Sequence, residues 1–267
     1  MQYKALAIDL DGTLLVGEDL PEENIRAVQS ARDAGISVMI ATARWSHLAL
    51  RLQEQMGIRD PIIACSGAQV LDPVAGRDVF DHRLPEDFTD QLFEICNAER
   101  CIATVTTTQD VRMKLEGELD RSLVGPEVEG VAQLSVNAHD LPRVVAVQGS
   151  RCNDRIRSEL GPRFNERVNI LDSVGPTGKI VLTITAKAAT KGAALTSACE
   201  HLGITPEQVV AFGDSENDLA MFELAGAAVA MGQADEATKA AATFVSKPNT
   251  EAGVAHGIYR LLKEGRL

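Results

Sequence analysis

The fold is decided by residues 5–13, which read ALAIDLDGT. The apolar first half predicts a short buried strand, and Gly12 is a residue type that lets the chain turn sharply. Asp9 and Asp11 are two positions apart, so on an extended backbone their side chains point in the same direction. Ligands of open parallel sheets bind beyond the carboxyl ends of the strands. This stretch therefore predicts a strand that carries two carboxylates to a ligand site.

Short apolar runs and helical patterns alternate on both sides of an interruption in the chain. Strands are predicted at 37–41, 61–65, 208–212, 227–231 and 243–246, and helices at 22–34, 47–56, 190–201, 217–224, 236–242 and 251–263. Continuous apolar strands separated by helices are typical of a parallel sheet that is covered on both faces. The predicted fold class is α/β, with a Rossmann-like doubly wound core.

The middle of the chain has a different pattern, which indicates an inserted domain. A hairpin is predicted at 69–84, then helices at 86–98 and 154–160 and strands at 102–107, 111–116, 144–148, 168–171 and 180–185. Apolar and polar residues alternate over 179–185, as expected for a sheet with one solvent-exposed face. We predict an α+β cap domain at 84–186, inserted between the core segments 1–83 and 187–267.

Polar residues end the core strands and would meet at one rim of the sheet. Thr42 follows the second strand, and Asp214 and Asp218 follow the strand at 208–212. Crowded carboxylates repel one another unless a cation neutralises them, and Mg²⁺ is the hard cation that such oxygens bind with substrate phosphate. Thr42 could bind an anion and Lys191 could balance its charge, a set that suits phosphoryl transfer. Each feature alone also fits a turn, a helix cap or a surface lysine.

The ordered set resembles the haloacid dehalogenase superfamily, specifically its Cof-type phosphatases of subclass IIB, which have a large inserted cap. The resemblance covers essentially the whole chain. It rests on DLDGTL at 9–14, on Thr42 in ATAR at 41–44, on Lys191-Gly192, and on GDSEND at 213–218. It implies an enzyme, a phosphoric monoester hydrolase, whose cap selects the substrate.

The resemblance also implies a role for each matching residue. Asp9 would be the nucleophile that forms an aspartyl-phosphate, and Asp11 would serve as general acid and then as general base. Mg²⁺ would be held by the Asp9 carboxylate, the Asp11 carbonyl and Asp214, with Asp218 in support. The phosphate would be bound by the side chains of Thr42, Lys191 and Asn217 and by backbone amides near Leu10 and Ala43.

Three positions at the predicted rim need separate comment. The family usually has glycine where this chain has Ala43, and asparagine where it has Ser66. The Ala43 methyl group could narrow the phosphate site, and Ser66 lacks an amide that could contact the substrate. Arg44 comes directly after Ala43 and could contact the substrate or form a surface ion pair.

Composition excludes several classes of function. The chain has 267 residues and a net charge of −12, so it has no global field to attract nucleic acid or an anionic membrane. No apolar run reaches the about 18 residues of a spanning helix, and we expect a cytoplasmic protein. The expected partner is a small-molecule phosphomonoester, with neither nucleic acid nor membrane involved. The sequence leaves the identity of the substrate and the oligomeric state open.

Two other functions fit parts of the pattern. A phosphosugar mutase of the same superfamily would pass the phosphoryl group to another hydroxyl group rather than to water. A phospho-accepting signalling module also gathers acidic residues, a threonine and a lysine on a parallel sheet. Such a module carries its accepting aspartate after the third strand, where this chain has Cys65-Ser66-Gly67. The leading prediction is a Mg²⁺-dependent phosphatase of a sugar phosphate or a similar metabolite.

The remaining candidate side chains are the cysteines and the positively charged residues of the predicted cap. The five cysteines are scattered and form no CxxC pair, so neither a zinc site nor a disulfide framework is predicted. We expect them to be reduced and mostly buried. Arg112, Lys114 and Arg121 in the insertion would either meet an anionic substrate or lie on a solvent-exposed sheet face.

Overall fold

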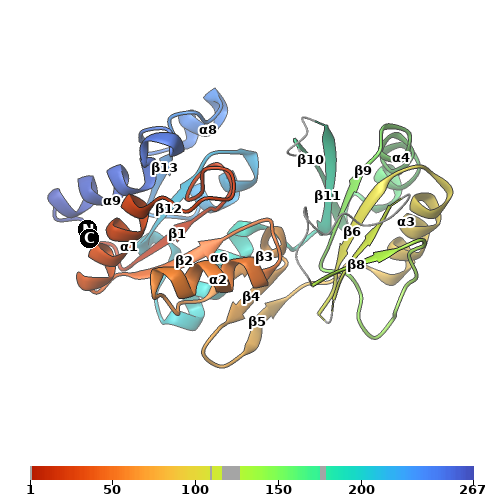
Figure 1. The fold of residues 1–267 in the computed structure, drawn as a ribbon, viewed down its shortest axis with the longest axis horizontal. Coiled ribbons are helices and arrows are strands. Elements are labelled where there is room, and N and C mark those ends of the chain that lie inside the picture. Colours follow the sequence, from red (N-terminus) through yellow and green to blue (C-terminus); the bar gives the residue numbers. More distant parts are fainter. Residues whose placement is uncertain (1, 109, 116–126, 175–178) are drawn as a thin grey trace. The chain divides into compact units, whose positions relative to one another are not determined.

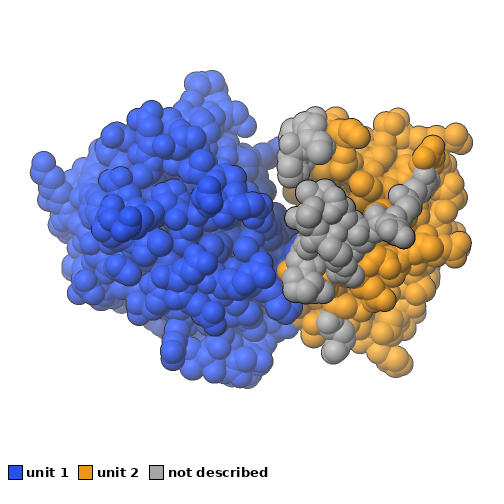
Figure 2. Space-filling model, in the orientation of Figure 1, with its two compact units in different colours: residues 1–80, 190–267 blue, residues 81–189 orange. Residues whose placement is uncertain are grey.

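The computed structural model describes residues 2–108, 110–115, 127–174 and 179–267. Two compact units are present, and the chain enters and leaves the second in the middle of the first (Figures 1 and 2). Unit 1 contains Met1–Phe80 and Thr190–Leu267, and unit 2 contains Asp81–Ala189. That these units act as the core and cap of an enzyme stays a prediction. Among the described helices, none has the length and apolar character needed to cross a lipid bilayer.

An eight-stranded sheet forms the centre of unit 1 (Figure 1). Its order is β14-β13-β12-β1-β2-β3-β4-β5, and all pairs from β14 to β3 are parallel. β4 is antiparallel to β3. The strands are β1 (Ala5–Ile8), β2 (Ser37–Ala41), β3 (Ile62–Ala64), β4 (Gln69–Asp72), β5 (Arg77–Asp81), β12 (Val209–Gly213), β13 (Ala227–Ala230) and β14 (Phe244–Val245).

Helices cover both faces of this sheet, as the continuous apolar strands require. Ala5 and Ala7 of β1 pack in one buried cluster with residues of α6 and α7. On the other face, Gly257 of α9 closely approaches the Phe212 ring of β12, and α9 packs on α1. The helices are α1 (Glu22–Asp33), α2 (Ser46–Met56), α6 (Lys191–Leu202), α7 (Leu219–Phe222), α8 (Glu236–Ala241) and α9 (Gly253–Lys263), with 3₁₀ turns η1 (Cys65–Gly67), η3 (Pro206–Gln208), η4 (Glu216–Asp218) and η5 (Asn249–Glu251).

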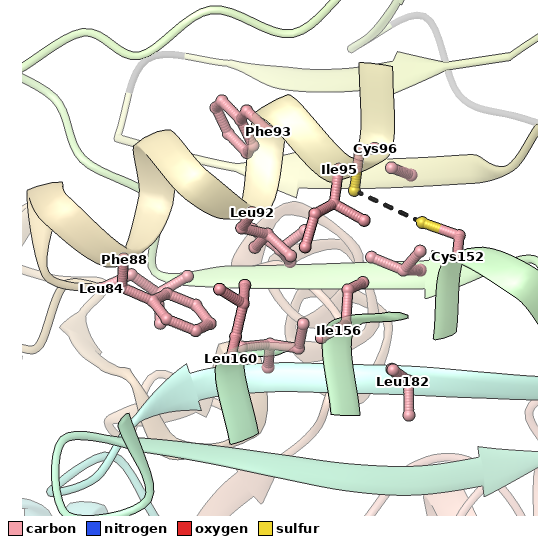
Figure 3. Close-up of a cluster of buried hydrophobic side chains, with 14 of the residues drawn as sticks. Leu84, Phe88, Leu92, Phe93, Ile95, Cys96, Cys152, Ile156, Leu160 and Leu182 are labelled. Carbon is pink, nitrogen blue, oxygen red and sulfur yellow. Dashed lines mark hydrogen bonds between the residues drawn. The ribbon is translucent and has the colours of Figure 1, made fainter. Parts of the chain in front are cut away.

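A six-stranded sheet in the order β10-β11-β9-β6-β7-β8 forms unit 2. Its pairs are antiparallel except for the parallel pair β7 and β8. Helices pack on one side through an apolar cluster, part of which Figure 3 shows. The elements are α3 (Glu86–Ala98), β6 (Ile102–Thr106), β7 (Val111–Lys114), β8 (Val128–Val131), β9 (Val144–Gln148), α4 (Ser150–Arg155), a π-helical segment η2 (Ile156–Leu160), α5 (Gly161–Phe164), β10 (Val168–Val174) and β11 (Ile180–Ala186).

The predicted α/β fold with a doubly wound parallel sheet is confirmed. Two details of unit 2 differ from the prediction. Strand β8 was not predicted, because its sequence VEGV is short and half polar. The helix predicted at 154–160 begins at Ser150 and continues through the π-helical segment. Arg121 and the end of the strand predicted at 111–116 lie outside the described residues.

Candidate active site

Strand β1 delivers Asp9 to the rim of the sheet because it lies between β2 and β12. Ile8 pairs with Ile40 on one side and with Phe212 on the other, so the next residues of all three strands emerge together. The Asp9 amide donates a hydrogen bond to the Phe212 carbonyl at 3.0 Å, so the backbone at Asp9 continues in the direction of β1. Asp9 is 4% exposed. A carboxylate this deeply buried requires a positive partner.

Lys191 of α6 is that partner. Its Nζ lies 2.6 Å from Asp9 Oδ1 and 2.7 Å from Asp218 Oδ1. The start of α6 is set by Thr190, whose side chain accepts a hydrogen bond from the Ala193 amide at 3.1 Å. The turn after β3 packs against the start of α6. Gly67 lies so close to the Thr190 backbone that a side chain at position 67 would overlap it. A buried ammonium is thus held between two buried carboxylates.

The turn after β12 brings two polar side chains, those of Asn217 and Asp218, to Lys191. Asp218 is fully buried, and its Oδ2 accepts hydrogen bonds from the amides of Asp214 and Ser215 at 3.0 and 3.2 Å. Asn217 Oδ1 accepts from the Ser215 hydroxyl at 3.0 Å and lies 3.4 Å from Lys191 Nζ. Both Asp218 oxygens are therefore engaged, which makes Asp218 an organiser of the turn.

Three carboxylates of this rim lie close enough to share one cation. One oxygen each of Asp9, Asp214 and Asp218 lie within 4.8 Å of one another. Oxygen donors of this kind fit a hard divalent ion such as Mg²⁺. Burial raises the pKa of the Asp9 carboxyl well above its ordinary value, against the opposing charge of Lys191. Burial, and next the charge of Asp218, raises the pKa of Asp214 to about 6. The site thus carries excess negative charge that a cation would relieve.

The ammonium group of Lys191 stays charged in this setting. Its burial favours the neutral amine, but the carboxylates of Asp218 and Asp9 outweigh that effect and raise the pKa of Lys191. A fixed positive charge beside Asp9 can attract a phosphate group and can stabilise charge that develops on it.

Gly12 lets the chain pass close to Asp214. Its φ of +80° is in the left-handed region, and a side chain there would overlap the Asp214 carboxylate. Thr13 donates a hydrogen bond from its hydroxyl to Asp214 Oδ1 at 3.2 Å. Gln233, which follows β13, donates to the Gly12 carbonyl at 2.6 Å. These contacts join the ends of β1, β12 and β13.

The Asp11 side chain takes a different direction from Asp9 and pairs with Arg44. The Arg44 guanidinium donates two hydrogen bonds to the Asp11 carboxylate and two to the Glu18 carboxylate. All four donor–acceptor distances lie between 2.5 and 2.9 Å. Asp11 remains partly exposed. Of the two alternatives for Arg44, the structure contains the ion pair.

Just beyond the paired ends of β1 and β2 lie Leu10, Thr42 and Ala43, as the register of these two strands requires. Thr42 is fully buried, and its hydroxyl accepts from the Arg44 amide at 3.1 Å. Within the described part of the chain, the backbone amides of Leu10 and Ala43 donate no hydrogen bond to protein. Backbone amides that are free to donate suit a phosphate group.

Apart from Leu10, Thr42 and Ala43, the predicted site residues fall into two groups. Four of them, Asp9, Lys191, Asn217 and Asp218, form one contact network, and Asp214 joins it through its amide and its carboxylate. Asp11 and Arg44 form a second pair at the same rim. Sequence reasoning missed Thr13, Glu18 and Gln233 as site residues. Gln233 could have been found, because it follows the strand at 227–231 as the other rim residues follow theirs.

The haloacid dehalogenase-like hydrolase family matches residues 6–258. The chain belongs to this family. A relative from Bacillus subtilis, 5-amino-6-(5-phospho-D-ribitylamino)uracil phosphatase YcsE, is 31% identical over 260 residues, which cover 97% of this chain and 95% of the relative. Pyridoxal phosphate phosphatase YbhA of Escherichia coli is 28% identical, with coverages of 97% and 98%.

Solved structures of this haloacid dehalogenase-like family have the same fold. A haloacid dehalogenase-like hydrolase from Bacteroides thetaiotaomicron superposes with a TM-score of 0.84 at 23% identity, over 97% of this chain and 100% of the other. Family membership and the named relatives identify the chain as a hydrolase, a phosphatase of the haloacid dehalogenase superfamily.

Proposed function

We propose that this phosphatase hydrolyses a small phosphomonoester, a sugar phosphate or a similar metabolite, with Mg²⁺ as its metal. The observation that carries the proposal is the buried Lys191–Asp9 contact of 2.6 Å beside Asp214. A carboxylate, an ammonium and a cation-binding group at one point suit phosphoryl transfer. Relatives named for a phospho-ribitylamino uracil and for pyridoxal phosphate support a phosphorylated metabolite as substrate. The cytoplasmic location stays a prediction.

Asp9 is the proposed nucleophile. One of its carboxylate oxygens attacks phosphorus, the ester P–O bond breaks, and an aspartyl-phosphate forms. Asp11 gives its proton to the leaving oxygen. In the second step Asp11 takes a proton from water, which attacks the same phosphorus and releases inorganic phosphate and the Asp9 carboxylate.

The phosphate is held by the donors around Asp9. Lys191 supplies a charge-assisted hydrogen bond, and Asn217 and the Thr42 hydroxyl can add neutral ones. The amides of Leu10 and Ala43 complete the set. We expect the Ala43 methyl group to narrow this space. The Ala43→Gly variant tests this and should have a lower KM for the substrate.

Asp9, the Asp11 carbonyl and Asp214 are the proposed metal ligands, and Asp218 orients the turn that carries Asp214. The metal would neutralise the carboxylates and the incoming phosphate. The Asp218 carboxylate already accepts hydrogen bonds from Lys191 and from two backbone amides. Its proposed role is therefore to support the metal site by orienting this turn.

The decisive experiment measures phosphate release from a panel of phosphorylated metabolites by the purified protein, with Mg²⁺ and with chelator. Asp9→Asn abolishes turnover, whereas Asp19→Asn, an exposed aspartate of the same loop, retains it. Turnover by Asp9→Asn would refute the covalent scheme. An isomerised sugar phosphate without free phosphate would identify a mutase, and a stable phosphoprotein without turnover would identify a signalling module.

A further inference from the structure

Two neighbouring cysteines of unit 2, Cys96 and Cys101, meet the distant Cys152 at one buried point. Cys96 lies on α3, Cys101 precedes β6, and Cys152 lies on α4. Their sulfur atoms all lie within 4.8 Å of one another, and the Cys96 and Cys152 sulfurs are 4.0 Å apart (Figure 3). All five cysteines of the chain are free thiols.

A buried ammonium group lies beside these thiols. Lys114 is only 5% exposed, and its Nζ donates to the Glu99 carbonyl at 2.9 Å and lies 3.8 Å from Cys101 Sγ. Among the residues that the structure describes, no carboxylate pairs with Lys114. Burying an ammonium is costly unless negative charge compensates it. An ammonium group 3.8 Å from a sulfur favours the thiolate form of that cysteine.

We propose that Cys96, Cys101 and Cys152 form a zinc-binding site in unit 2, with Lys114 as its charge-balancing neighbour. Thiolates are the ligands that select thiophilic ions such as Zn²⁺. Two sulfurs on one tetrahedral zinc are about 3.8 Å apart, given Zn–S bonds of about 2.3 Å. The observed separations exceed that value by about 1 Å or less. Three thiolates, one Zn²⁺ and one ammonium together are electrically neutral.

The site has a path for the ion. Cys101 lines a cavity of about 800 Å³ whose wall also includes Gly149 and Asn153. The ion can enter from this side, and water can take the fourth position that zinc leaves open when protein supplies three ligands.

The test uses the full-length, reduced, metal-free protein in excess Mg²⁺, which occupies the acidic rim of unit 1. Zn²⁺ is titrated against a chromophoric chelator, and Co²⁺ is added separately as a spectroscopic probe. We expect one equivalent of Zn²⁺ to bind, Co²⁺ to give a thiolate charge-transfer band, and all three thiols to resist alkylation. Absence of the band, or alkylation of the three thiols unchanged by Zn²⁺, overturns the proposal.

Single variants assign the ligands. Cys101→Ala and Cys152→Ala should weaken Zn²⁺ binding by more than the roughly 10–100-fold that loss of an outer partner costs. Lys114→Met keeps the three thiols and should weaken binding by about 10–100-fold. Cys199→Ala, a buried cysteine of unit 1, should bind as the unaltered protein does. Equal binding by Cys101→Ala and Cys199→Ala, with both variants folded by thermal melting, would mean that the sulfurs are core residues only.

Discussion

The Arg44 guanidinium donates two hydrogen bonds to the Asp11 carboxylate, at 2.9 and 2.5 Å. The same guanidinium binds Glu18, so Arg44 is anchored on a second carboxylate while it orients the first. In the proposed reaction Asp11 moves the proton, and Arg44 thus acts as a positioning residue for Asp11 in its ionised form, which serves as the general base.

Replacing Arg44 should therefore affect the chemical step. Arg44→Met is expected to lower kcat by about tenfold, equivalent to about 1.4 kcal/mol, because Asp11 is no longer held. Steady-state kinetics on a phosphomonoester measure the effect, with Arg26→Met on exposed α1 as the control. A rise in KM at unchanged kcat would instead make Arg44 a substrate contact and contradict the positioning role.

The close approach of Gly12 to Asp214 predicts a difference between two glycine substitutions. Gly17 also has a positive φ, +62°, but a side chain there meets open space. Gly17→Ala should cost about 1–2 kcal/mol of stability from backbone strain alone. Gly12→Ala should cost as much and also displace the Asp214 carboxylate, which weakens Mg²⁺ binding. Denaturant unfolding and Mg²⁺ titration of both variants check this. Equal Mg²⁺ affinities would exclude a role of Gly12 in the metal site.

Lys191 should contribute strongly to the stability of the metal-free protein. Lys191→Met leaves the buried carboxylates of Asp9 and Asp218 without their cation, at an expected cost of about 3–5 kcal/mol in the free energy of unfolding. Added Mg²⁺ should recover part of that loss, because it supplies positive charge at the same place. Lys263→Met, at an exposed position of α9, should change stability by less than about 0.5 kcal/mol. Chemical denaturation of both variants and of the unaltered protein, each with and without Mg²⁺, gives these values. Equal stability of the two metal-free variants would contradict the buried ion pair.

The raised pKa of Asp214 predicts how metal binding depends on pH. Below about pH 6 this carboxyl holds a proton in the metal-free protein, and the proton must leave before a cation can bind. The affinity for Mg²⁺ should therefore fall as the pH drops through this range, by up to about tenfold for each pH unit from the Asp214 proton alone, and the raised pKa of Asp9 adds to the fall. Calorimetric titration across the range measures it. Asp214→Asn should bind Mg²⁺ weakly with a flatter pH profile, and an unaltered protein with constant affinity on both sides of pH 6 would refute the assignment.

The sequence predicted the parallel core because its strands are continuous apolar runs with polar residues at their ends. The order of the four sequence motifs predicted that Asp9 and Lys191 would meet, although 182 positions separate them and Lys191 begins a helix. It could not predict that Arg44 would pair with Asp11, because that choice depends on side-chain direction in a loop. It also gave no sign of the Cys96, Cys101 and Cys152 cluster. Their convergence follows from the way α3 and α4 pack on the second sheet, and no local spacing encodes that packing.

The position of β1 between β2 and β12 has a consequence for biosynthesis. Until the ribosome has completed β12, one edge of β1 has no partner, and Asp9, the proposed nucleophile, has neither its lysine nor its acidic neighbours. Unit 2, by contrast, is one uninterrupted stretch of chain and is translated before the second half of unit 1. The nascent chain can therefore assemble the proposed site only after residues 191–218 have been translated, when the inserted unit has already been made and has had time to fold.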